Sequence, residues 1–529
     1  MVTAQKLEGI PSMLHNVLTR REALHQTVAL LGTASVAGSL FANPPGENAR
    51  EQTHWPMYQG PLGNSCVPAP SERLHEDLNR ATRIWDSQEN DLPVGKLLSS
   101  GNPFTRPSGG MSGLIKGGET IFFAYFQPGG EVSAANWVRR GVPADRLISA
   151  DDVVLAVNAT NGRTLWKTVR EDRGVNHAPT KRGGWAVTPA YHSGRVFSLG
   201  TTGRLYALDA TNGRLLWEQN IGPFHQRMEA MKRQALAQRR MGSWTPMRCS
   251  LTVAGGVVVV PDYVGSRDTG LAGYDVQTGR RLWHRAAATF NMAAPAVWHH
   301  EGREYLLAGT YSGHLRLLDP TNGRVLWEVA DLGPQEEQLA PGTDQVIVNV
   351  KAGDDRETPK LYGAYRLHPE RAERVWTMPD RSEFHAERGG DGAAYRRVSV
   401  VGNQFVIYRN YRPNRNERIT GLWLVSPENG RILNTMPIER GGWTNVFHPV
   451  GDRQLLWVHD ASHHNPSFSL IRLQDNRLTA LGQTWDPTNR NEGTSAYEVP
   501  MPYPIPDGRM YLRTSVGVIR AFDLRQSTE

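Results

Sequence analysis

Cysteine is scarce in this sequence, and its scarcity excludes several kinds of protein. The chain of 529 residues contains 2 cysteines, Cys66 and Cys249, so a disulfide framework is excluded and at most one bridge can join two distant segments. Neither cysteine belongs to a Cys-x-x-Cys-His sequence for covalent haem or to a four-ligand zinc spacing. A haem domain attached in this way is therefore excluded, and whether the two cysteines pair stays open.

Charge tracts of one sign are also missing. Lys and Arg number 59 against 52 Asp and Glu, and the resulting net charge of +7 is scattered along the chain, so nucleic acid is not an expected partner. The chain is instead rich in glycine, with 53 residues, and in tryptophan, with 15. This composition favours turns and aromatic packing over long helices and predicts an all-β protein.

The N-terminal segment has the pattern of an export signal. Arg20 and Arg21 form a twin-arginine sequence, and the apolar run from Val28 to Ala42 is too short for a permanent transmembrane helix. We expect residues 1–43 to be a twin-arginine (Tat) signal, cleaved after Ala37 or Ala42. The mature chain would then be periplasmic or secreted, without a transmembrane anchor. An ordinary amphipathic N-terminal helix is the alternative.

Four segments of the chain superpose without gaps. In each, a polar Asp or Asn precedes a glycine by four positions and a tryptophan follows the glycine by four. The four segments are Val157–Trp166, Leu208–Trp217, Tyr274–Trp283 and Leu318–Trp327. Such recurrence indicates a repeat architecture.

Each residue of the repeat has a readable role. The Asp or Asn bonds the backbone two residues on, and the glycine supplies the positive φ of a tight hairpin. The next strand carries the tryptophan, which a single hairpin cannot cover. Burying about 200 Å² of indole against a neighbouring blade stabilises each junction by roughly 5 kcal/mol. The predicted structural docking residues are Trp85, Trp166, Trp217, Trp283, Trp327 and Trp376.

Weaker copies continue the series toward the C-terminus. His368, Ala372 and Trp376 keep the spacing, as do Ser426, Gly430 and Asn434, and a further copy runs through 470–481. The last copy, 518–523, lacks its partner strand, whereas 81–86 has a tryptophan strand without a preceding hairpin half. We therefore predict an eight-bladed β-propeller over residues 44–529, in which 81–86 completes the last blade and closes the ring.

The full pattern, Ala-x-Asp-x-x-x-Gly-x-x-x-Trp in 207–217, is similar to the tryptophan-docking repeat of PQQ-like propellers, the quinoprotein alcohol dehydrogenase-like superfamily. His54-Trp55-Pro56 followed by Gly60-Pro61 resembles the opening of exported PQQ-like repeat proteins of planctomycete-type bacteria. This resemblance implies two functional classes. One contains dehydrogenases that use pyrroloquinoline quinone (PQQ). The other contains binding and scaffolding propellers, such as the outer-membrane assembly lipoprotein.

The sequence departs from the dehydrogenase class in its cofactor signatures. Quinoprotein alcohol dehydrogenases carry two adjacent cysteines beside PQQ and hold a metal with Glu, Asn and Asp. No adjacent cysteine pair is present here, and no carboxylate cluster is assignable to the metal or to a catalytic base. No cofactor is therefore predicted, and catalytic residues are not assigned. We expect a binding or scaffolding module, with a quinoprotein oxidoreductase using PQQ and calcium as the alternative.

Polar and aromatic residues precede the predicted innermost strands, at one mouth of the central channel. We predict that they bind a protein partner or a small anionic or sugar-like ligand, with a plug of side chains and water as the alternative. We expect a monomer. The ligand-binding candidates are Trp185, Arg248, Asn291, Arg396, Trp443, Asn445 and Tyr497.

Two further segments have weaker functional patterns. His459, His463 and His464 lie close together, as in a transition-metal site, but neighbouring residues of a strand face opposite sides, so an exposed loop is the favoured interpretation and no metal site is predicted. The segment 224–241 predicts an inserted basic helix on the propeller rim, able to dock an acidic partner or an anionic lipid surface. A solvated capping helix is its alternative.

The export assignment is testable by replacing Arg20 and Arg21 with lysine. Because the pathway recognises the arginine pair itself, we expect the variant protein to accumulate in the cytoplasm. Immunoblots of cytoplasmic and periplasmic fractions measure the change. An unchanged periplasmic yield would contradict the signal assignment.

Overall fold

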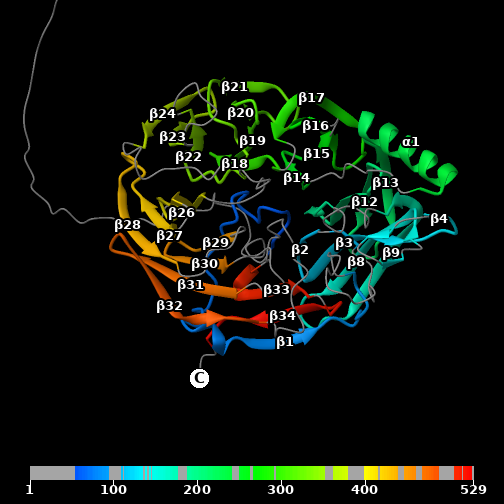
Figure 1. Ribbon diagram of the computed structural model, residues 1–529, viewed down its shortest axis with the longest axis horizontal. Coiled ribbons are helices and arrows are strands. Elements are labelled where there is room, and N and C mark those ends of the chain that lie inside the picture. Colours follow the sequence, from blue (N-terminus) through cyan, green and yellow to red (C-terminus); the bar gives the residue numbers. More distant parts are fainter. Residues whose placement is uncertain are drawn as a thin grey trace, which may run out of the picture. The chain divides into compact units, whose positions relative to one another are not determined.

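Eight antiparallel sheets radiate from a common axis (Figure 1). This computed structural model describes residues 54–93, 109–110, 112–134, 138–139, 142–143, 146–176, 187–240, 250–262, 266–290, 293–336, 338–351, 361–378, 398–414, 417–438, 446–459, 467–487, 505–514 and 516–526. They belong to one compact unit, Leu40–Glu529. Within the described ranges, no helix has the length and apolar character needed to cross a membrane.

Blades 1 to 4 have four strands each, ordered from the axis outward. Their strands are β2 (Leu114–Gly117), β3 (Thr120–Pro128), β8 (Ser149–Asn158) and β9 (Thr164–Val175); β10 (Ala190–His192), β11 (Arg195–Leu199), β12 (Arg204–Asp209) and β13 (Leu215–Asn220); β14 (Thr252–Ala254), β15 (Val257–Asp262), β16 (Asp268–Asp275) and β17 (Arg281–Phe290); and β18 (Ala296–His300), β19 (Arg303–Gly309), β20 (Leu315–Leu318) and β21 (Val325–Val329). Between β3 and β8, two short ladders pair β4 (Ser133–Ala134) with β7 (Arg146–Leu147) and β5 (Val138–Arg139) with β6 (Val142–Pro143).

Blades 5 to 8 complete the ring. Their strands are β22 (Gln345–Val350), β23 (Leu361–Leu367) and β24 (Ala372–Thr377); β25 (Val398–Val401), β26 (Gln404–Asn414), β27 (Glu417–Val425) and β28 (Ile432–Pro437); β29 (Val446–Val450), β30 (Gln454–His459), β31 (Ser467–Gln474) and β32 (Arg477–Trp485); and β33 (Arg509–Arg513), β34 (Ile519–Asp523) and β1 (Thr82–Asp86). Short 3-10 turns at η2 (Leu78–Arg80) and η3 (Pro506–Gly508) flank blade 8.

The predicted eight-bladed propeller, with its ring closed by both ends of the chain, is confirmed. β1 pairs antiparallel with β34, in the register that places Trp85 opposite Ala521. The side chain of Arg520 fixes this pairing by donating two hydrogen bonds to the carboxylate of Asp86, at 2.8 and 3.0 Å. The outer edge of β34 is thus paired with a strand from the N-terminal part of the sequence, which completes blade 8.

The turn before each tryptophan strand follows from its residue types. In blade 2, the carboxylate of Asp209 accepts the N–H of Thr211 at 2.8 Å, and the carbonyl of Asp209 accepts the N–H of Gly213 at 2.8 Å. Gly213 has φ +73°, which costs a residue with a Cβ about 1–2 kcal/mol. Asp, Asn or Ser recurs at the first position for the same local hydrogen bonds.

Each of the six tryptophans contacts the turn of the next blade. The indole Nε1 donates to a backbone carbonyl there at 2.8–3.3 Å, and five of the six side chains are only 7–9% exposed. The indole faces also cover the turn glycines, where a Cβ, if the glycine had one, would lie 2.5–2.7 Å from a ring atom. The pairs are Trp85–Gly162, Trp166–Gly213, Trp217–Gly279, Trp283–Gly323 and Trp376–Gly430.

Two junctions lack this tryptophan contact and use other groups. Between blades 6 and 7, the amide oxygen of Asn434 accepts the N–H of Leu478 at 3.0 Å. Between blades 7 and 8, Trp485 packs edge-on against Phe522, with ring centroids 5.0 Å apart. The amide oxygen of Asn434 and the ring of Trp485 thus join the blades at the two junctions where the repeat is degenerate.

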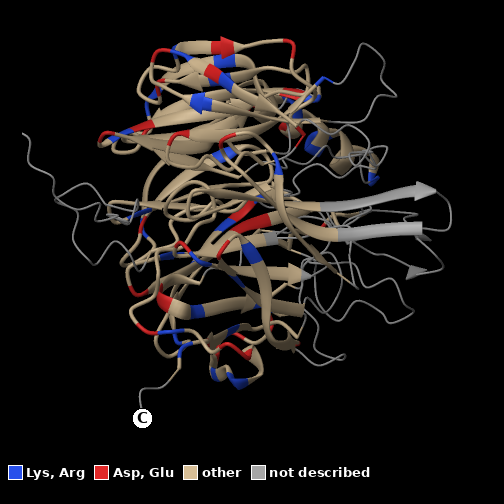
Figure 2. Cartoon of the chain, turned by 90° about the vertical axis from the view of Figure 1, so that its left-hand side faces the viewer, with Lys and Arg blue, Asp and Glu red and all other residues tan. Residues whose placement is uncertain are grey.

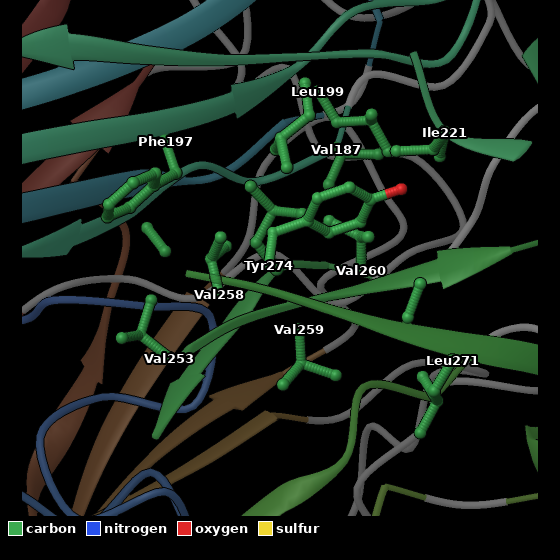
Figure 3. Close-up of a cluster of buried hydrophobic side chains, with 14 of the residues drawn as sticks. Val187, Phe197, Leu199, Ile221, Val253, Val258, Val259, Val260, Leu271 and Tyr274 are labelled. Carbon is green, nitrogen blue, oxygen red and sulfur yellow. The ribbon is translucent and has the colours of Figure 1, made fainter. Parts of the chain in front are cut away.

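The core between neighbouring blades is built from the apolar faces of their strands. Figure 3 shows one such cluster, in which side chains of blade 2, including Phe197 and Leu199, meet those of blade 3, including Val258, Val260 and Tyr274. The central strands are buried on both sides, because each blade lies between two others. This explains the continuous apolar sequence of β15.

The segment 224–241 contains the one long helix in the described part of the chain. Helix α1 spans Gly222–Gln238 and lies on the outer edge of the ring, after blade 2 (Figure 1). It begins at Gly222-Pro223, where proline is tolerated in the first turn, and ends at Arg239 in the left-handed conformation.

Replacing Gly213 with alanine tests the junction. Gly194 has almost the same φ, +74°, but a Cβ at that position would have no atom within 4 Å. We expect Gly194→Ala to destabilise by about 1 kcal/mol from backbone strain, and Gly213→Ala by about 1–3 kcal/mol more, because its methyl group displaces the indole of Trp166. Urea unfolding measures both. Equal losses would contradict a packing role for this glycine.

Candidate functional site

The predicted ligand-binding residues precede the innermost strands, and all seven lie outside the described residues. These are Trp185, Arg248, Asn291, Arg396, Trp443, Asn445 and Tyr497. His463 and His464 also lie outside them, as does Cys249, and of the histidine group only the backbone of His459, the last residue of β30, is described. The site is therefore built here from the described residues around the axis.

An irregular segment, residues 54–67, crosses the middle of the ring; we call it the axial segment. It belongs to the blue part of the chain that passes inside the innermost strands in Figure 1. Trp55 forms an antiparallel bridge with Lys116 of β2, and Val67 forms a parallel bridge with Val450 of β29. The backbone carbonyl of Pro56 accepts the N–H of Tyr191, from β10, at 2.7 Å.

Side chains of the axial segment bind further blades. The amide nitrogens of Gln59 and Asn64 donate to the carbonyls of Leu339 and Pro341 at 3.2 and 2.8 Å, on the approach to blade 5. The sulfur of Cys66 lies 3.4 Å from the carbonyl oxygen of Val400 in β25. The segment therefore lies inside the ring and contacts several blades there.

Several polar atoms of this segment are buried without a described partner. Trp55, Gln59 and Ser65 are at most 2% exposed, and the indole Nε1, the amide Oε1 and the hydroxyl of these residues have no hydrogen-bond partner among the described residues. Buried polar atoms of native proteins are nearly always satisfied, often by ordered water. The axis beside the axial segment is therefore polar.

Hydrogen bonds also link the segments that lead into neighbouring blades. The hydroxyl of Thr188, before β10, accepts the N–H of Gly113, before β2, at 2.9 Å. Gln338 exchanges two hydrogen bonds with the backbone of Ala294, at 2.5 and 3.1 Å. These bonds hold the segments that lead to the predicted ligand-binding residues.

Arg513 performs the same task between blades 8 and 1. Its guanidinium donates to the carbonyls of Pro93, Gly110 and Ser112 at 2.8–3.3 Å and lies 4.4 Å from the ring centroid of Phe123. Burial lowers the pKa of Arg513 to about 9. This arginine therefore serves as a fixed donor to backbone carbonyls, and not as a solvated cation.

Asp152 is a fully buried acid at the junction of blades 1 and 2. Its carboxylate accepts the hydroxyl of Tyr206 at 2.9 Å and the N–H and hydroxyl of Thr201 at 3.1 and 3.4 Å. Burial raises the pKa of Asp152 to about 6, although these bonds and the charge of Lys232 act in the opposite direction. The acid therefore joins two blades beneath α1.

The described residues do not provide a recognisable metal site. They contain no group of three His, Cys, Asp or Glu side chains able to hold an ion. A smaller pair exists in blade 3, where the imidazole Nε2 of His284 lies 2.9 Å from the carboxylate of buried Asp262. Among the described basic residues near the axis, Arg513 is committed to backbone carbonyls and the ammonium of Lys116 donates to the carbonyl of Gly118 at 2.6 Å, so neither is assigned to a carboxylate of PQQ.

An eight-bladed ring of tryptophan-docking repeats defines a PQQ-like propeller. Residues 150–433, more than half of the chain, match the protein family PQQ_2, described as outer membrane protein assembly factor BamB. The chain belongs to this family.

Named relatives come from both solved structures and a curated sequence. A polyvinylalcohol dehydrogenase of Pseudomonas sp is 24% identical over 299 residues, which cover 45% of this chain and 45% of that protein. The quinohemoprotein alcohol dehydrogenases of Pseudomonas putida HK5 (ADHIIG) and Comamonas testosteroni each have a TM-score of 0.51, over 90% of this chain and 81% of theirs, at 10% and 12% identity. At this identity the two solved structures show the fold alone.

Sequence reasoning missed the residues that hold the axis together. Four side chains each donate to backbone carbonyls of segments far away in the sequence, namely those of Gln59, Asn64, Gln338 and Arg513. The spacing of residues in the sequence does not predict such contacts. A signal was available for Arg513, which interrupts the apolar sequence Met510-Tyr511-Leu512 at the end of a strand. An arginine at the end of a buried strand indicates that hydrogen-bond acceptors surround its guanidinium.

The buried acid predicts a specific pH dependence. Because the folded-state pKa of Asp152 is raised from 3.8 to about 6, its contribution to stability is complete below pH 4 and is lost as the pH rises through 6. We expect Asp152→Asn to remove this loss, so the free energy of unfolding of the wild type should fall relative to the variant by about 2 kcal/mol between pH 4.5 and 7.5. Urea unfolding at both pH values tests this, and a constant difference would contradict it.

Proposed function

We propose that this protein is an exported binding or scaffolding propeller whose ligand or partner surface lies at the end of the axis where the innermost strands begin. One observation carries the proposal: Thr188 and Ala294, each three residues after a candidate residue (Trp185 and Asn291), are hydrogen-bonded to segments that lead into other blades. The chain is therefore held in place three residues after two of the candidate positions, as a binding surface requires.

The candidate residues there have a consistent chemistry. Arg248 and Arg396 would donate paired hydrogen bonds to an anion, while Trp185 and Trp443 would stack against an apolar or sugar face. Asn291, Asn445 and Tyr497 would add neutral donors and acceptors. This combination suits an anionic or sugar-like ligand, or an acidic group of a protein partner.

The surrounding framework favours binding over catalysis. The buried charged groups nearby, Arg513 and Asp152, are engaged in joining blades, and the six docking tryptophans are engaged in the junctions. Such a framework is rigid and positions a surface without itself supplying a proton donor or acceptor at the axis. A propeller that binds a ligand or partner without catalysis requires only such a framework and a surface held on it.

A quinoprotein oxidoreductase is the second candidate. It is favoured by the match to a polyvinylalcohol dehydrogenase and by that relative's name, although the match spans 45% of each protein. In that case PQQ, with calcium, would lie on the axis at the same end. Residues outside the described ranges would have to supply the metal ligands.

The compartment is part of the proposal. The twin-arginine sequence at Arg20-Arg21 supports export of the chain to the periplasm, or beyond it. The matched family is described by an outer membrane protein assembly factor, and a role at the cell envelope agrees with that destination.

The two candidate functions are separated by adding PQQ and calcium to the full chain. Dye reduction is measured with primary and secondary alcohols, sugars and poly(vinyl alcohol). A binding propeller gives no turnover, and calorimetry detects no PQQ binding. Turnover with any of these substrates would overturn the proposal in favour of the oxidoreductase.

Ligand binding is tested by calorimetry with uronic acids as probes. We expect Arg248→Ala and Arg396→Ala each to weaken binding about 10- to 100-fold, since a buried charge-assisted hydrogen bond contributes about 1.5–3 kcal/mol. Arg163→Ala, on an exposed turn, is the control and should have no effect. Equal affinity in all variants, or no binding by the wild type, would contradict an anion site at this position.

A further inference from the structure

Helix α1 is fixed to the ring along one face. Phe224, Met228, Lys232 and Ala235 are buried there, at intervals of three or four residues that place them on one side of a helix. The ring of Phe224 lies over Gly203, at the beginning of β12. The imidazole Nδ1 of His225 lies 2.8 Å from the carbonyl oxygen of Thr202. This face is committed to the propeller.

Two charged residues of the helix are also committed to the ring. The ammonium of Lys232 donates to the carbonyl and the carboxylate of Asp172 at 2.5 and 2.8 Å. The carboxylate of Glu229, the acidic residue of the helix, accepts the guanidinium of Arg204 at 3.0 Å. The helix therefore retains no carboxylate of its own for its other basic residues.

Four arginines remain on the outward side and at the end of the helix. Arg227, Arg233, Arg239 and Arg240 are exposed, and none forms an ion pair or hydrogen bond through its side chain with the described residues. Elsewhere basic and acidic residues are intermixed over the strands and turns, as Figure 2 shows. The outward side of α1 is thus a local concentration of unpaired positive charge.

We propose that these four arginines form a docking surface for an acidic segment of a partner protein. Arg227 and Arg233 are six positions apart, so they lie about 9 Å apart along the helix axis and on opposite flanks of its outward side, while Arg239 and Arg240 follow its last turn. A polyproline II segment with a carboxylate at every third position presents these groups on one side at intervals of about 9 Å, within reach of several long arginine side chains. Guanidinium groups bind carboxylates through two parallel hydrogen bonds, which favours Glu or Asp as the partner residues.

A lipid surface fits the same helix less well. Membrane-surface helices insert large apolar side chains, but here Phe224 and Met228 are buried against the propeller. The exposed positions hold short or polar side chains, namely Pro223, Gln226, Arg227, Ala230, Arg233, Gln234, Ala237 and Gln238. Without an apolar anchor, a protein segment that pairs with the arginines is the favoured occupant.

The surface lies on the outer edge of the ring, and not at the axis, so it extends beyond the proposed function and can fail independently of it. The test uses the full chain and a fluorescent peptide of Glu-Pro-Pro repeats, followed by fluorescence anisotropy. We expect Arg227→Glu with Arg233→Glu to weaken peptide binding about tenfold or more, and added salt to weaken binding to the wild type.

Matched variants separate docking from net charge. Arg163→Glu with Arg214→Glu makes the same charge change on exposed hairpin turns and should leave the affinity unchanged, and Gln-Pro-Pro repeats should not bind the wild type. Thermal melting verifies that both double variants fold. Equal losses in the two variants, or no binding by the wild type, would overturn the proposal. Tighter binding to phosphatidylglycerol vesicles that is lost in the α1 variant would overturn it in favour of a membrane surface.

Discussion

The contact between an indole and the glycine turn of the next blade is the interaction on which the ring depends. It explains three positions of the repeat together. The Asp or Asn closes the turn, and the glycine allows the positive φ and also leaves room for the indole. In blades 1 to 3, a small residue two positions before the Asp or Asn lies opposite the tryptophan of its own blade, as Ala207 lies opposite Trp217. A β-bulge beside this pair directs the indole outward to the neighbour. Each repeat therefore contributes the indole of one junction and the turn of another.

This reciprocity is why the fold was predictable from the sequence. Similar residue types recur at these three positions from blade to blade. The incomplete copies of the repeat at 81–86 and 518–523 together make one blade. Irregular features were less accessible. Blade 5 has no described innermost strand, and Gln335 replaces part of its ladder by bonding the carbonyls of Gly333 and Asn349 at 2.7 Å. Such substitutions leave no periodic trace in the sequence.

The candidate site stays a prediction, because its residues belong to connections and not to repeats, and all seven lie outside the described residues. The same holds for the axial segment. Its opening, from Trp55 to Gly60, was recognised as a motif, yet its position inside the ring depends on partners such as Lys116, Leu339 and Val400, which come from separate blades. A pattern within one segment carries no information about partners hundreds of residues away. Family membership likewise fixes the blades, while function depends on the connections between them.

Closure of blade 8 also has a kinetic consequence. The hydrogen bonds between Arg520 and Asp86 join residues separated by 434 positions, so β1 is synthesised almost a whole chain before its partner β34. Until then β1 has an unpaired edge and Trp85 has a turn to contact, in blade 1, but no sheet to belong to. Contacts of such long sequence separation are formed late, after the entropy of closing the loop has been overcome. Blades 1 to 7 are thus able to assemble locally and in order, whereas the last blade converts an open, aggregation-prone array into a ring only after β34 has been synthesised.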